Sequence, residues 1–344
     1  MNGFTVLTTH KMDRDSINLL LENGIEVIDP PDSGKVDRRN WILENIRYAS
    51  ILIAGFINID RTIIDKAINL ELIVSRSSGV DHIDVAYAER KGICIANQPE
   101  AIAEAVAEHV VGLVISSYRN ITMGHNYVIQ GAWYSTRKFL RGLTLKGKTL
   151  GVLGMGRIGS LVSFYLRMLG ISRILYWSRT RKKELEQLLK AEPANVDRIL
   201  EESDIIVIAL PMTSETRGMI NYSLLSKVKK NALIVNVGRG GIIDEEALVR
   251  ILNERDDILA ALDVYEEEPL PPESKLVETA RETGRLLLTP HNAGGTEFSM
   301  KLTSLLAARQ VIHYVNTGEV WNPVTKTCKE SKDIRGLWMD FTVY

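Results

Sequence analysis

Short apolar runs alternate with amphipathic stretches along the first hundred residues of the chain. The stretch "DRDSINLLLENG" (13–24) has helical spacing, with Asp13 as a plausible N-cap and Gly24 as a C-cap. Alternation of strand and helix predicts a parallel sheet with crossover helices. The predicted strands are β-branched runs: "TVLTT" (5–9), "EVID" (26–29), "ILIAGF" (51–56), "ELIVSR" (71–76) and "ICIAN" (93–97).

A second alternating block follows a long predicted helix over residues 101–130, and a last helix over 296–317 leads the chain away. The tail from 328 to 344 has no clear period, so it is either a loose extension or is held to a surface by Trp338 and Phe341. The predicted fold class is α/β, with two open parallel sheets covered by helices on both faces. The strands predicted for the second block are "TLGVLG" (149–154), "RILYW" (173–177), "DIIVIAL" (204–210), "ALIVNV" (232–237), "LAALDV" (259–264) and "LLLTP" (286–290).

Composition agrees with two globular domains. The chain has 344 residues, of which 45% are hydrophobic and 25% charged, and its net charge is −1. This balance gives no indication of a nucleic-acid partner or an anionic membrane. The longest apolar run, residues 105–117, is broken by Glu108 and His109 and is too short to span a bilayer.

The two cysteines, Cys94 and Cys328, do not form a disulfide framework by number or spacing. A reducing, cytoplasmic setting is therefore expected, and the N-terminal stretch "MNGFTVLTTHK" is expected to be a strand and not a signal peptide. No H-x-x-x-H pattern or pair of nearby cysteines indicates a metal site.

Residues 142–159, "GLTLKGKTLGVLGMGRIG", contain two phosphate-binding patterns. The first, G-x-x-x-x-G-K-T over 142–149, leads into a strand, whereas a triphosphate loop must follow a strand and open a helix. The second, G-x-G-x-x-G, lies between a predicted strand and a predicted helix. There Gly154 permits the tight turn, Gly156 lets the backbone approach a pyrophosphate, and Gly159 allows close packing of helix and strand. The second pattern therefore predicts a dinucleotide site.

The next predicted strand should end in an acidic residue if the dinucleotide is NAD, because a carboxylate accepts hydrogen bonds from the ribose hydroxyls. The chain has Ser178 there, followed by Arg179 and Thr180. A hydroxyl and a guanidinium can bind a 2′-phosphate that a carboxylate would repel. This predicts NADP as the cofactor, with NAD as the second choice.

Three later strands end in isolated polar residues. Arg239 follows "LIVNVG", Asp263 and Glu268 follow "LAAL", and His291 follows "LLLTP". In an open α/β sheet, ligands bind at the carboxyl ends of strands. An arginine can bind a carboxylate through two parallel hydrogen bonds, and a histidine oriented by a carboxylate is a general acid or base. Together with a dinucleotide, these residues suit hydride transfer to or from a hydroxy or keto acid.

At this point the chain resembles the D-isomer-specific 2-hydroxyacid dehydrogenases, over nearly its whole length. The motifs that carry the resemblance are "GVDHID" (79–84), "AEAVAEHVVGL" (103–113), "GMGRIG" (154–159), "LPMTSETRGMI" (210–220), "NVGRGGIID" (236–244), "ALDVYEEEP" (261–269) and "TPHNAGGT" (289–296). The last four of these, taken in order, are the most specific.

The resemblance implies a role for each site residue. Arg239 would hold the substrate carboxylate and carbonyl, His291 would transfer the proton, and Glu268 would orient His291. Backbone donors of Ser78 and Gly79 would bind the substrate carboxylate, and Arg76 could add positive charge nearby. Asp263 would hold the nicotinamide carboxamide. The full cofactor set would be Gly154, Gly156, Arg157, Ile158, Gly159, Ser178, Arg179, Thr180, Leu210, Pro211, Thr216, Val237, Gly238, Asp263 and Ala293.

The resemblance also implies the architecture. A flavodoxin-like substrate-binding domain, residues 1–98 plus 293–344, would contain an inserted Rossmann-type dinucleotide-binding domain, residues 99–292. Members of the family are commonly homodimers through the cofactor domain.

The expected function is NADP(H)-dependent reduction of a small 2-oxoacid, with glyoxylate or hydroxypyruvate favoured. "SRTRK" (178–182) resembles the reductases that use NADP(H), whereas "SRSSGVDHID" (75–84) is closer to the D-lactate type. A D-lactate-type enzyme and a short phosphoglycerate dehydrogenase therefore stay open as alternatives. A dinucleotide-sensing co-repressor is the alternative from another class, because such proteins keep the same catalytic residues.

Overall fold

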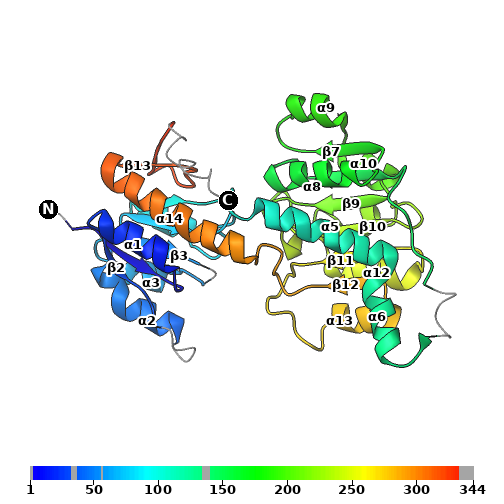
Figure 1. Cartoon of the computed structure of the whole chain (residues 1–344), viewed down its shortest axis with the longest axis horizontal. Helices are drawn as coiled ribbons and strands as arrows, with labels where there is room; N and C mark the ends of the chain where they lie inside the picture. Colours follow the sequence, from blue (N-terminus) through cyan, green and yellow to red (C-terminus); the bar gives the residue numbers. More distant parts are fainter. Residues whose placement is uncertain (1–2, 32–36, 56, 134–139, 333–344) are drawn as a thin grey trace. The chain divides into compact units, whose positions relative to one another are not determined.

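The computed structural model describes residues 3–31, 37–55, 57–133 and 140–332 of the chain (Figure 1). The chain divides into two compact units. Unit 1 comprises Met1–Ile102 and Thr296–Tyr344, and unit 2 comprises Ala103–Gly295. The two crossings between the units lie four and three residues after those expected from the sequence, at 98/99 and 292/293.

Unit 1 contains a parallel sheet of five strands in the order β2-β1-β3-β4-β5. Each strand has three or four residues, because the apolar runs between loops are that short. The strands are β1 (Thr5–Thr8), β2 (Glu26–Ile28), β3 (Ile51–Ala54), β4 (Leu72–Ser75) and β5 (Cys94–Ala96). The helices are α1 (Arg14–Glu22), α2 (Arg38–Asn45), α3 (Arg61–Lys66), α4 (Val85–Arg90) and α14 (Glu297–Thr317).

Both faces of this sheet are buried, because successive side chains of a strand point to opposite faces. Leu7 of β1 packs with Ile42 of α2 and Ile63 of α3 on one face. Its neighbour Val6 packs on the other face with Leu20 of α1 and Val311 of α14. The predicted caps also appear, since the Asp13 side chain accepts a hydrogen bond from the Ser16 amide at 3.0 Å and Gly24 has a left-handed φ of 73°.

The cysteines contradict the expectation from the sequence, because Cys94 and Cys328 form a disulfide across 234 residues. Cys94 lies in β5, and the segment after α14 runs along the same strand. The Val324 amide donates to the Ile95 carbonyl at 2.8 Å, and the Ile95 amide donates to the Thr325 hydroxyl at 2.9 Å. The cysteines therefore give no indication of a reducing setting.

The C-terminal segment also forms a small parallel pair, β13 (Glu319–Val320) with β14 (Lys329–Glu330). Part of the tail that showed no period is thus ordered. Trp338 and Phe341 lie outside the described residues.

Unit 2 contains a parallel sheet of seven strands in the order β12-β11-β10-β9-β6-β7-β8. The strand order reverses between β6 and β9, which makes the carboxyl ends of these two strands the switch point of the sheet. The strands are β6 (Thr149–Leu153), β7 (Arg173–Trp177), β8 (Ala191–Pro193), β9 (Ile205–Ile208), β10 (Leu233–Asn236), β11 (Leu259–Leu262) and β12 (Leu286–Leu288).

Helices cover both faces of the larger sheet (Figure 1). On one face α5 and α8 pack together, and on the other face Leu200 of α10, Leu248 of α12 and Leu276 of α13 join one apolar core with the strands. The α/β fold class predicted from the sequence is confirmed. The helices are α5 (Ala103–Arg119), α6 (Ile121–Ile129), α8 (Arg157–Met168), α9 (Lys183–Leu189), α10 (Val196–Glu202), α11 (Tyr222–Leu225), α12 (Glu245–Glu254) and α13 (Lys275–Thr283).

The long helix predicted over 101–130 is wrong as a single element. It begins at Ala103 and is interrupted at Asn120, whose φ of 52° lies in the left-handed region. Asparagine tolerates this conformation better than most residues, so the chain can turn there and start α6. Among the described residues, no helix combines the length and apolar character needed to cross a membrane.

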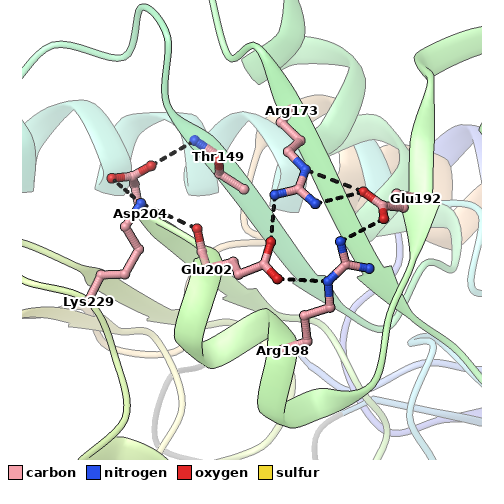
Figure 2. Close-up of polar contacts among 7 residues, drawn as sticks. All are labelled: Thr149, Arg173, Glu192, Arg198, Glu202, Asp204 and Lys229. Atoms are coloured by element: carbon pink, nitrogen blue, oxygen red, sulfur yellow. Dashed lines mark hydrogen bonds and ion pairs between the residues drawn. The ribbon is translucent and has the colours of Figure 1, made fainter.

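An ion-pair ring lies at the edge of the sheet where β7 begins (Figure 2). Arg173 binds Glu192 at 2.8 Å and Glu202 at 2.6 Å, and Arg198 binds the same two carboxylates at 2.7 and 2.8 Å. Each charge thus has two opposite neighbours, and such a network is favoured over isolated surface pairs.

Asp204 lies beside this ring, just before β9 (Figure 2). Its carboxylate accepts hydrogen bonds from the Thr149 amide at 2.8 Å and from Lys148 at 3.2 Å, and Lys229 lies 3.0 Å away. Burial acts to raise the pKa of the Asp204 carboxyl, but these three donors outweigh it and hold the pKa below its usual value. The amino-terminal edge of the sheet is therefore occupied by structural charge pairs.

Candidate functional site

The site residues predicted for unit 2 follow the carboxyl ends of six strands of one sheet. Parallel strands bring these ends to a single edge, so the residues are neighbours although they span more than a hundred positions. They follow β6 (Gly154–Gly159), β7 (Ser178–Thr180), β9 (Leu210 and Pro211), β10 (Val237–Arg239), β11 (Asp263 and Glu268) and β12 (His291 and Ala293).

The glycine loop lies between β6 and α8, at the switch point of the sheet. Gly154 has a φ of 104°, and a Cβ there would lie 2.5 Å from the Ala209 carbonyl oxygen. Gly156, the N-cap of α8, has an ordinary φ of −86°, and a Cβ there would meet nothing within 4 Å. No protein contact therefore requires glycine at 156. A ligand that approaches the backbone at the helix N-terminus would require it, so the loop fits a pyrophosphate.

The two arginines after β7, Arg179 and Arg181, differ in the partners of their guanidinium groups. Arg181 is paired with Glu186 through Nε at 2.8 Å and Nη2 at 2.9 Å, and Glu186 also accepts from the Tyr176 hydroxyl. Arg179 is exposed and makes no hydrogen bond or ion pair within the described part of the chain. Ser178 is half-buried at the end of the strand. Of the two arginines, Arg179 is thus the one with a guanidinium available for an anion.

The loop after β9 is held in shape by the hydroxyl group of one of its own residues, Thr216. The Thr216 side chain donates to the Pro211 carbonyl at 2.8 Å and accepts from the Thr213 amide at 2.8 Å. Leu210, Thr216 and Val237 are buried, whereas Pro211 is exposed to solvent. Thr216 therefore shapes the loop through its hydroxyl.

Arg239 follows β10 on a turn that Asn236 organises. The Asn236 amide group donates to the Arg239 carbonyl at 2.9 Å, and its oxygen accepts from the Gly238 amide at 3.1 Å. The Arg239 guanidinium donates to the Gly238 carbonyl at 2.8 Å and is half-buried. Asn236 is the last residue of the apolar run "LIVN", and a polar residue in that place is the signal that sequence reasoning missed.

His291 and Glu268 form a direct pair. Their Nδ1 and Oε2 atoms are 2.6 Å apart, while Glu268 Oε1 accepts from the Tyr265 amide at 2.9 Å. Burial acts to raise the pKa of the Glu268 carboxyl, but the hydrogen bonds from His291 and Tyr265, with the charge of Arg239, hold that pKa below its usual value. Glu268 is therefore the ionised partner, and His291 presents its other nitrogen, Nε2, from a side chain that is 34% exposed.

His291 also has an unusual backbone. Its φ of 48° is left-handed, a conformation that costs a non-glycine residue about 1–3 kcal/mol. Such a conformation persists only where neighbouring contacts determine it, and it is found more often at functional sites than elsewhere.

Asp263 lies inside the protein, with 1% of its surface exposed. Its carboxylate accepts hydrogen bonds from the Thr289 hydroxyl at 2.6 Å and from the amides of Asn292 at 3.1 Å and Ala293 at 3.0 Å. A nicotinamide carboxamide, the ligand expected for Asp263, would have to bind a carboxylate that already accepts these three hydrogen bonds. Thr289 and its hydroxyl were missed from the sequence, although the residue begins the "TPHNAGGT" motif.

In unit 1, the loop after β4 presents two backbone amides. The Ser78 carbonyl accepts from Asn97 at 2.7 Å, and the Gly79 carbonyl accepts from Ser77 at 2.7 Å and Ser75 at 3.0 Å. Within the described residues, the amides of Ser78 and Gly79 donate to no protein acceptor. Both residues are half-buried.

Arg76 lies differently from its neighbours in that loop. It is 8% exposed, and its guanidinium donates to Ser304 of α14 at 2.8 Å. Burial lowers the pKa of Arg76, with Asp13 and Asp29 acting against this. The placement favours a role in joining β4 to α14. Among the described residues, no group of three or more His, Cys, Asp or Glu side chains could hold a metal ion.

Comparison with known proteins gives the family. Residues 111–293 match the family model described as "D-isomer specific 2-hydroxyacid dehydrogenase, NAD binding domain". The chain belongs to this family. The matched residues include the glycine loop, Arg239, Glu268 and His291, and the family members are oxidoreductases, so the protein is an enzyme of that class.

Similar proteins cover the rest of the chain. A glyoxylate reductase of Pyrococcus furiosus is 33% identical over 336 residues, which are 96% of this chain and 97% of that one. A D-3-phosphoglycerate dehydrogenase of Methanocaldococcus jannaschii is 35% identical over 308 residues, 89% of this chain but 56% of that one. The solved structure of an NADPH-dependent glyoxylate/hydroxypyruvate reductase of Sinorhizobium meliloti, in complex with NADP and malonate, has a TM-score of 0.79 at 27% identity and covers 96% of this chain and 99% of its own.

Proposed function

We propose that this 2-hydroxyacid dehydrogenase reduces glyoxylate or hydroxypyruvate with NADPH. The observation that carries the proposal is the pair of His291 and Glu268, 2.6 Å apart, on the same sheet edge as the glycine loop. A histidine held by an ionised carboxylate is a proton donor for a carbonyl oxygen. The names of the Pyrococcus furiosus and Sinorhizobium meliloti proteins support the choice of substrate.

Glu268 determines which nitrogen of His291 transfers the proton. The carboxylate can only accept, so Nδ1 keeps its hydrogen, and Nε2 is the atom that gains and loses a proton. A bound nicotinamide dinucleotide would supply the hydride. His291 then gives its Nε2 proton to the substrate oxygen, and Glu268 stabilises the charged imidazolium beforehand.

Arg239 is the proposed anchor for the substrate anion. Its guanidinium can bind a carboxylate in a bidentate manner, and Asn236 fixes the turn from which it extends. We assign the amides of Ser78 and Gly79 as donors to a substrate carboxylate, because the loop fixes their positions and they donate to no acceptor among the described residues. Arg76, whose guanidinium is buried against Ser304, is left out of this set.

The cofactor proposal rests on Gly156 and Arg179. Gly156 leaves open space at the N-terminus of α8, where helix amides bind a pyrophosphate. Arg179, with Ser178 and Thr180, offers charge and hydroxyls where a 2′-phosphate would bind. The remaining cofactor residues expected from the sequence belong to the segments that follow β9, β10, β11 and β12.

A homodimer through unit 2 belongs to the same proposal. Ile121, Val128 and Ile129 of α6 are exposed at helical spacing, and Trp133 follows them. A contiguous set of exposed apolar side chains indicates a binding surface. We expect a particle of twice the 38.5 kDa chain mass in light scattering. Ile129→Lys should dissociate it, whereas Leu188→Lys, on the exposed surface of α9, should not.

A panel of 2-oxoacids tests the function directly. Glyoxylate, hydroxypyruvate, pyruvate and 3-phosphohydroxypyruvate are each offered with NADPH and with NADH, and the oxidation of the cofactor is followed by absorbance. The highest kcat/KM should be with glyoxylate or hydroxypyruvate and NADPH. Preference for pyruvate or for the phosphorylated acid would instead support the D-lactate-type or phosphoglycerate alternative.

His291→Ala is the matched variant in this panel. General acid catalysis supplies a rate increase of roughly 10²- to 10⁴-fold, so kcat should fall by about that factor while cofactor binding stays unchanged.

A native protein that binds the dinucleotide but reduces no member of the panel would favour the co-repressor alternative.

A further inference from the structure

Three successive backbone carbonyls in the loop after β4 accept hydrogen bonds from within unit 1. The first, that of Ser77, accepts from the Gln98 amide at 3.0 Å. The third, that of Gly79, accepts from the hydroxyls of Ser77 at 2.7 Å and Ser75 at 3.0 Å. Ser75, Ser77 and Gln98 are all buried, so water competes little for these bonds. Buried donors thus fix the loop at both ends.

The second carbonyl, that of Ser78, depends on a single side chain. The side-chain amide of Asn97 donates to it at 2.7 Å, and no other group in the described part of the chain does so. Asn97 is half-buried and directly follows β5. Loss of its side chain would therefore release the Ser78 carbonyl, whereas the Gly79 carbonyl has two hydroxyl donors.

The geometry of the peptide bond transmits this contact to the next amide. In a trans peptide, the carbonyl of one residue and the N–H of the following residue point in opposite directions. The bond from Asn97 to the Ser78 carbonyl therefore also sets the direction of the Gly79 N–H. In the same way, the bond from Gln98 to the Ser77 carbonyl sets the direction of the Ser78 N–H. These are the two amides that we assigned to a substrate carboxylate.

The backbone of Asn97 is itself held by the C-terminal segment. Its amide donates to the Asn322 carbonyl at 3.3 Å. The same segment is bonded to β5 through the disulfide between Cys94 and Cys328. Asn97 is thus fixed at its backbone as well as at its side chain, which a residue that orients another group requires.

We infer that Asn97 is a positioning residue for substrate binding: it holds the Ser78 carbonyl and thereby directs the Gly79 amide toward the substrate carboxylate. The inference rests on the proposed role of the Ser78 and Gly79 amides. Asn97 acts through the peptide between these two residues, and the reacting atoms are handled by His291 and the cofactor.

Asn97→Leu is the sharpest variant, because leucine keeps the size and branching of the side chain and removes the donor. A hydrogen bond to a charged group contributes about 10- to 100-fold in affinity. The Gly79 amide is released in this variant but still present, so we expect the low end of that range. KM of the preferred oxoacid should rise about tenfold, while kcat stays within about threefold, because the carboxylate is bound equally before and during reaction. Asn97→Ala, which removes the same donor with less bulk, should give the same result.

Asn45 offers a matched control in the same unit. It is half-buried at the end of α2, and its side-chain amide donates to the Trp41 carbonyl at 2.8 Å. Asn45→Leu therefore removes an equivalent hydrogen bond away from the loop after β4, and it should leave KM at the native value. Thermal melts of both variants measure the loss of folding stability separately.

Oxamate, an unreactive analogue of a 2-oxoacid, measures carboxylate binding without turnover. Its Kd for the enzyme saturated with NADPH is followed by the fluorescence of the cofactor. This Kd should rise about tenfold in Asn97→Leu and Asn97→Ala and stay unchanged in Asn45→Leu, and the Kd of NADPH should stay within about threefold in all three. The methyl ester of the preferred oxoacid has no carboxylate charge, so its kcat/KM should change less than threefold.

The outcomes separate this inference from the proposed function. If the native protein reduces no oxoacid, the proposed function is wrong. If it is active, but both Asn97 variants keep the native KM and the native Kd of oxamate, the positioning role alone is wrong. Equal losses for oxamate, the methyl ester and NADPH would show a general disturbance of the fold and would also overturn the inference.

Discussion

Arg179 should determine the preference for NADPH over NADH, and Arg181 should not. Both arginines follow β7 and both are exposed. Arg181 already has a bidentate partner in Glu186, at 2.8 and 2.9 Å, whereas Arg179 has none in the described part of the chain. The pair Arg179→Ala and Arg181→Ala therefore removes the same charge from neighbouring positions with different expected results.

The magnitude follows from the hydrogen bond that Arg179 can make. A bond to a charged group contributes about 1.5–3 kcal/mol, which is about 10- to 100-fold in affinity. Because the side chain is exposed, solvent and salt reduce this, and we expect about tenfold at low ionic strength. Arg181→Ala should change NADPH affinity less than about threefold, since Glu186 neutralises most of its charge.

The assay is kcat/KM for NADPH and NADH with one oxoacid, at about 0.01 M and about 0.1 M salt. These conditions change the Debye length from about 30 to about 10 Å. Arg179→Ala should lose NADPH efficiency mainly at low salt and keep its NADH efficiency. Ser178→Asp should invert the preference, because a carboxylate repels a 2′-phosphate and accepts ribose hydroxyls.

Two results would refute this reasoning. The first is an Arg179→Ala variant that keeps its full NADPH preference at low salt. The second is an Arg181→Ala variant that loses the preference, which would mean that Glu186 releases Arg181 when the cofactor binds. A native enzyme that favours NADH would remove the cofactor proposal and leave the family assignment unchanged.

Three further predictions concern the pair at the site, the disulfide and the charged edge of unit 2. Glu268→Gln keeps an acceptor for the His291 ring but removes the negative charge that stabilises the imidazolium, so kcat should fall about 10- to 100-fold, and an unchanged kcat at all pH values would contradict this. Reduction of Cys94–Cys328, which spans 234 residues, should lower the melting temperature, with about 5 kcal/mol as the upper value of the chain-entropy model; Cys328→Ser should melt alike with and without reductant. Asp204→Asn should destabilise by about 1–3 kcal/mol near neutral pH. Because the pKa of Asp204 is lowered in the folded state, this difference should be complete above the unfolded pKa, near 4, and should disappear as pH falls through the folded value; equal losses at all pH values in thermal melts would contradict it.

The sequence by itself determined the local features of this protein. The period of its apolar residues predicted eleven strands in two blocks, and each corresponds to a strand of the two parallel sheets. Asp13 and Thr296 begin helices where the sequence predicted helix starts. The spacing of Gly154, Gly156 and Gly159 predicted the strand–turn–helix loop. Gly154 has a left-handed φ of 104°, and a Cβ at Gly159 would lie 2.2 Å from the Gly154 carbonyl oxygen.

Other local features gave no usable signal. β8 (Ala191–Pro193) is too short to show a period and contains a proline, so the sequence did not predict it. The left-handed turn at Asn120 interrupts an apolar pattern that otherwise continues through α5 and α6. Periodicity cannot show a break of one residue, because the apolar face resumes after it.

Contacts across large distances in sequence were decided by the tertiary structure alone. Cys94 and Cys328 meet because the chain returns to β5 after unit 2, and Arg76 meets Ser304 because α14 packs on the sheet of unit 1. The sequence places Asp263 at the end of a strand but does not show which donors its carboxylate meets. In the fold, its carboxylate is enclosed by donors 26 to 30 residues away. A residue type limits the chemistry that a position can perform, but the partners that use this chemistry are set by which strand ends the fold brings to the same edge.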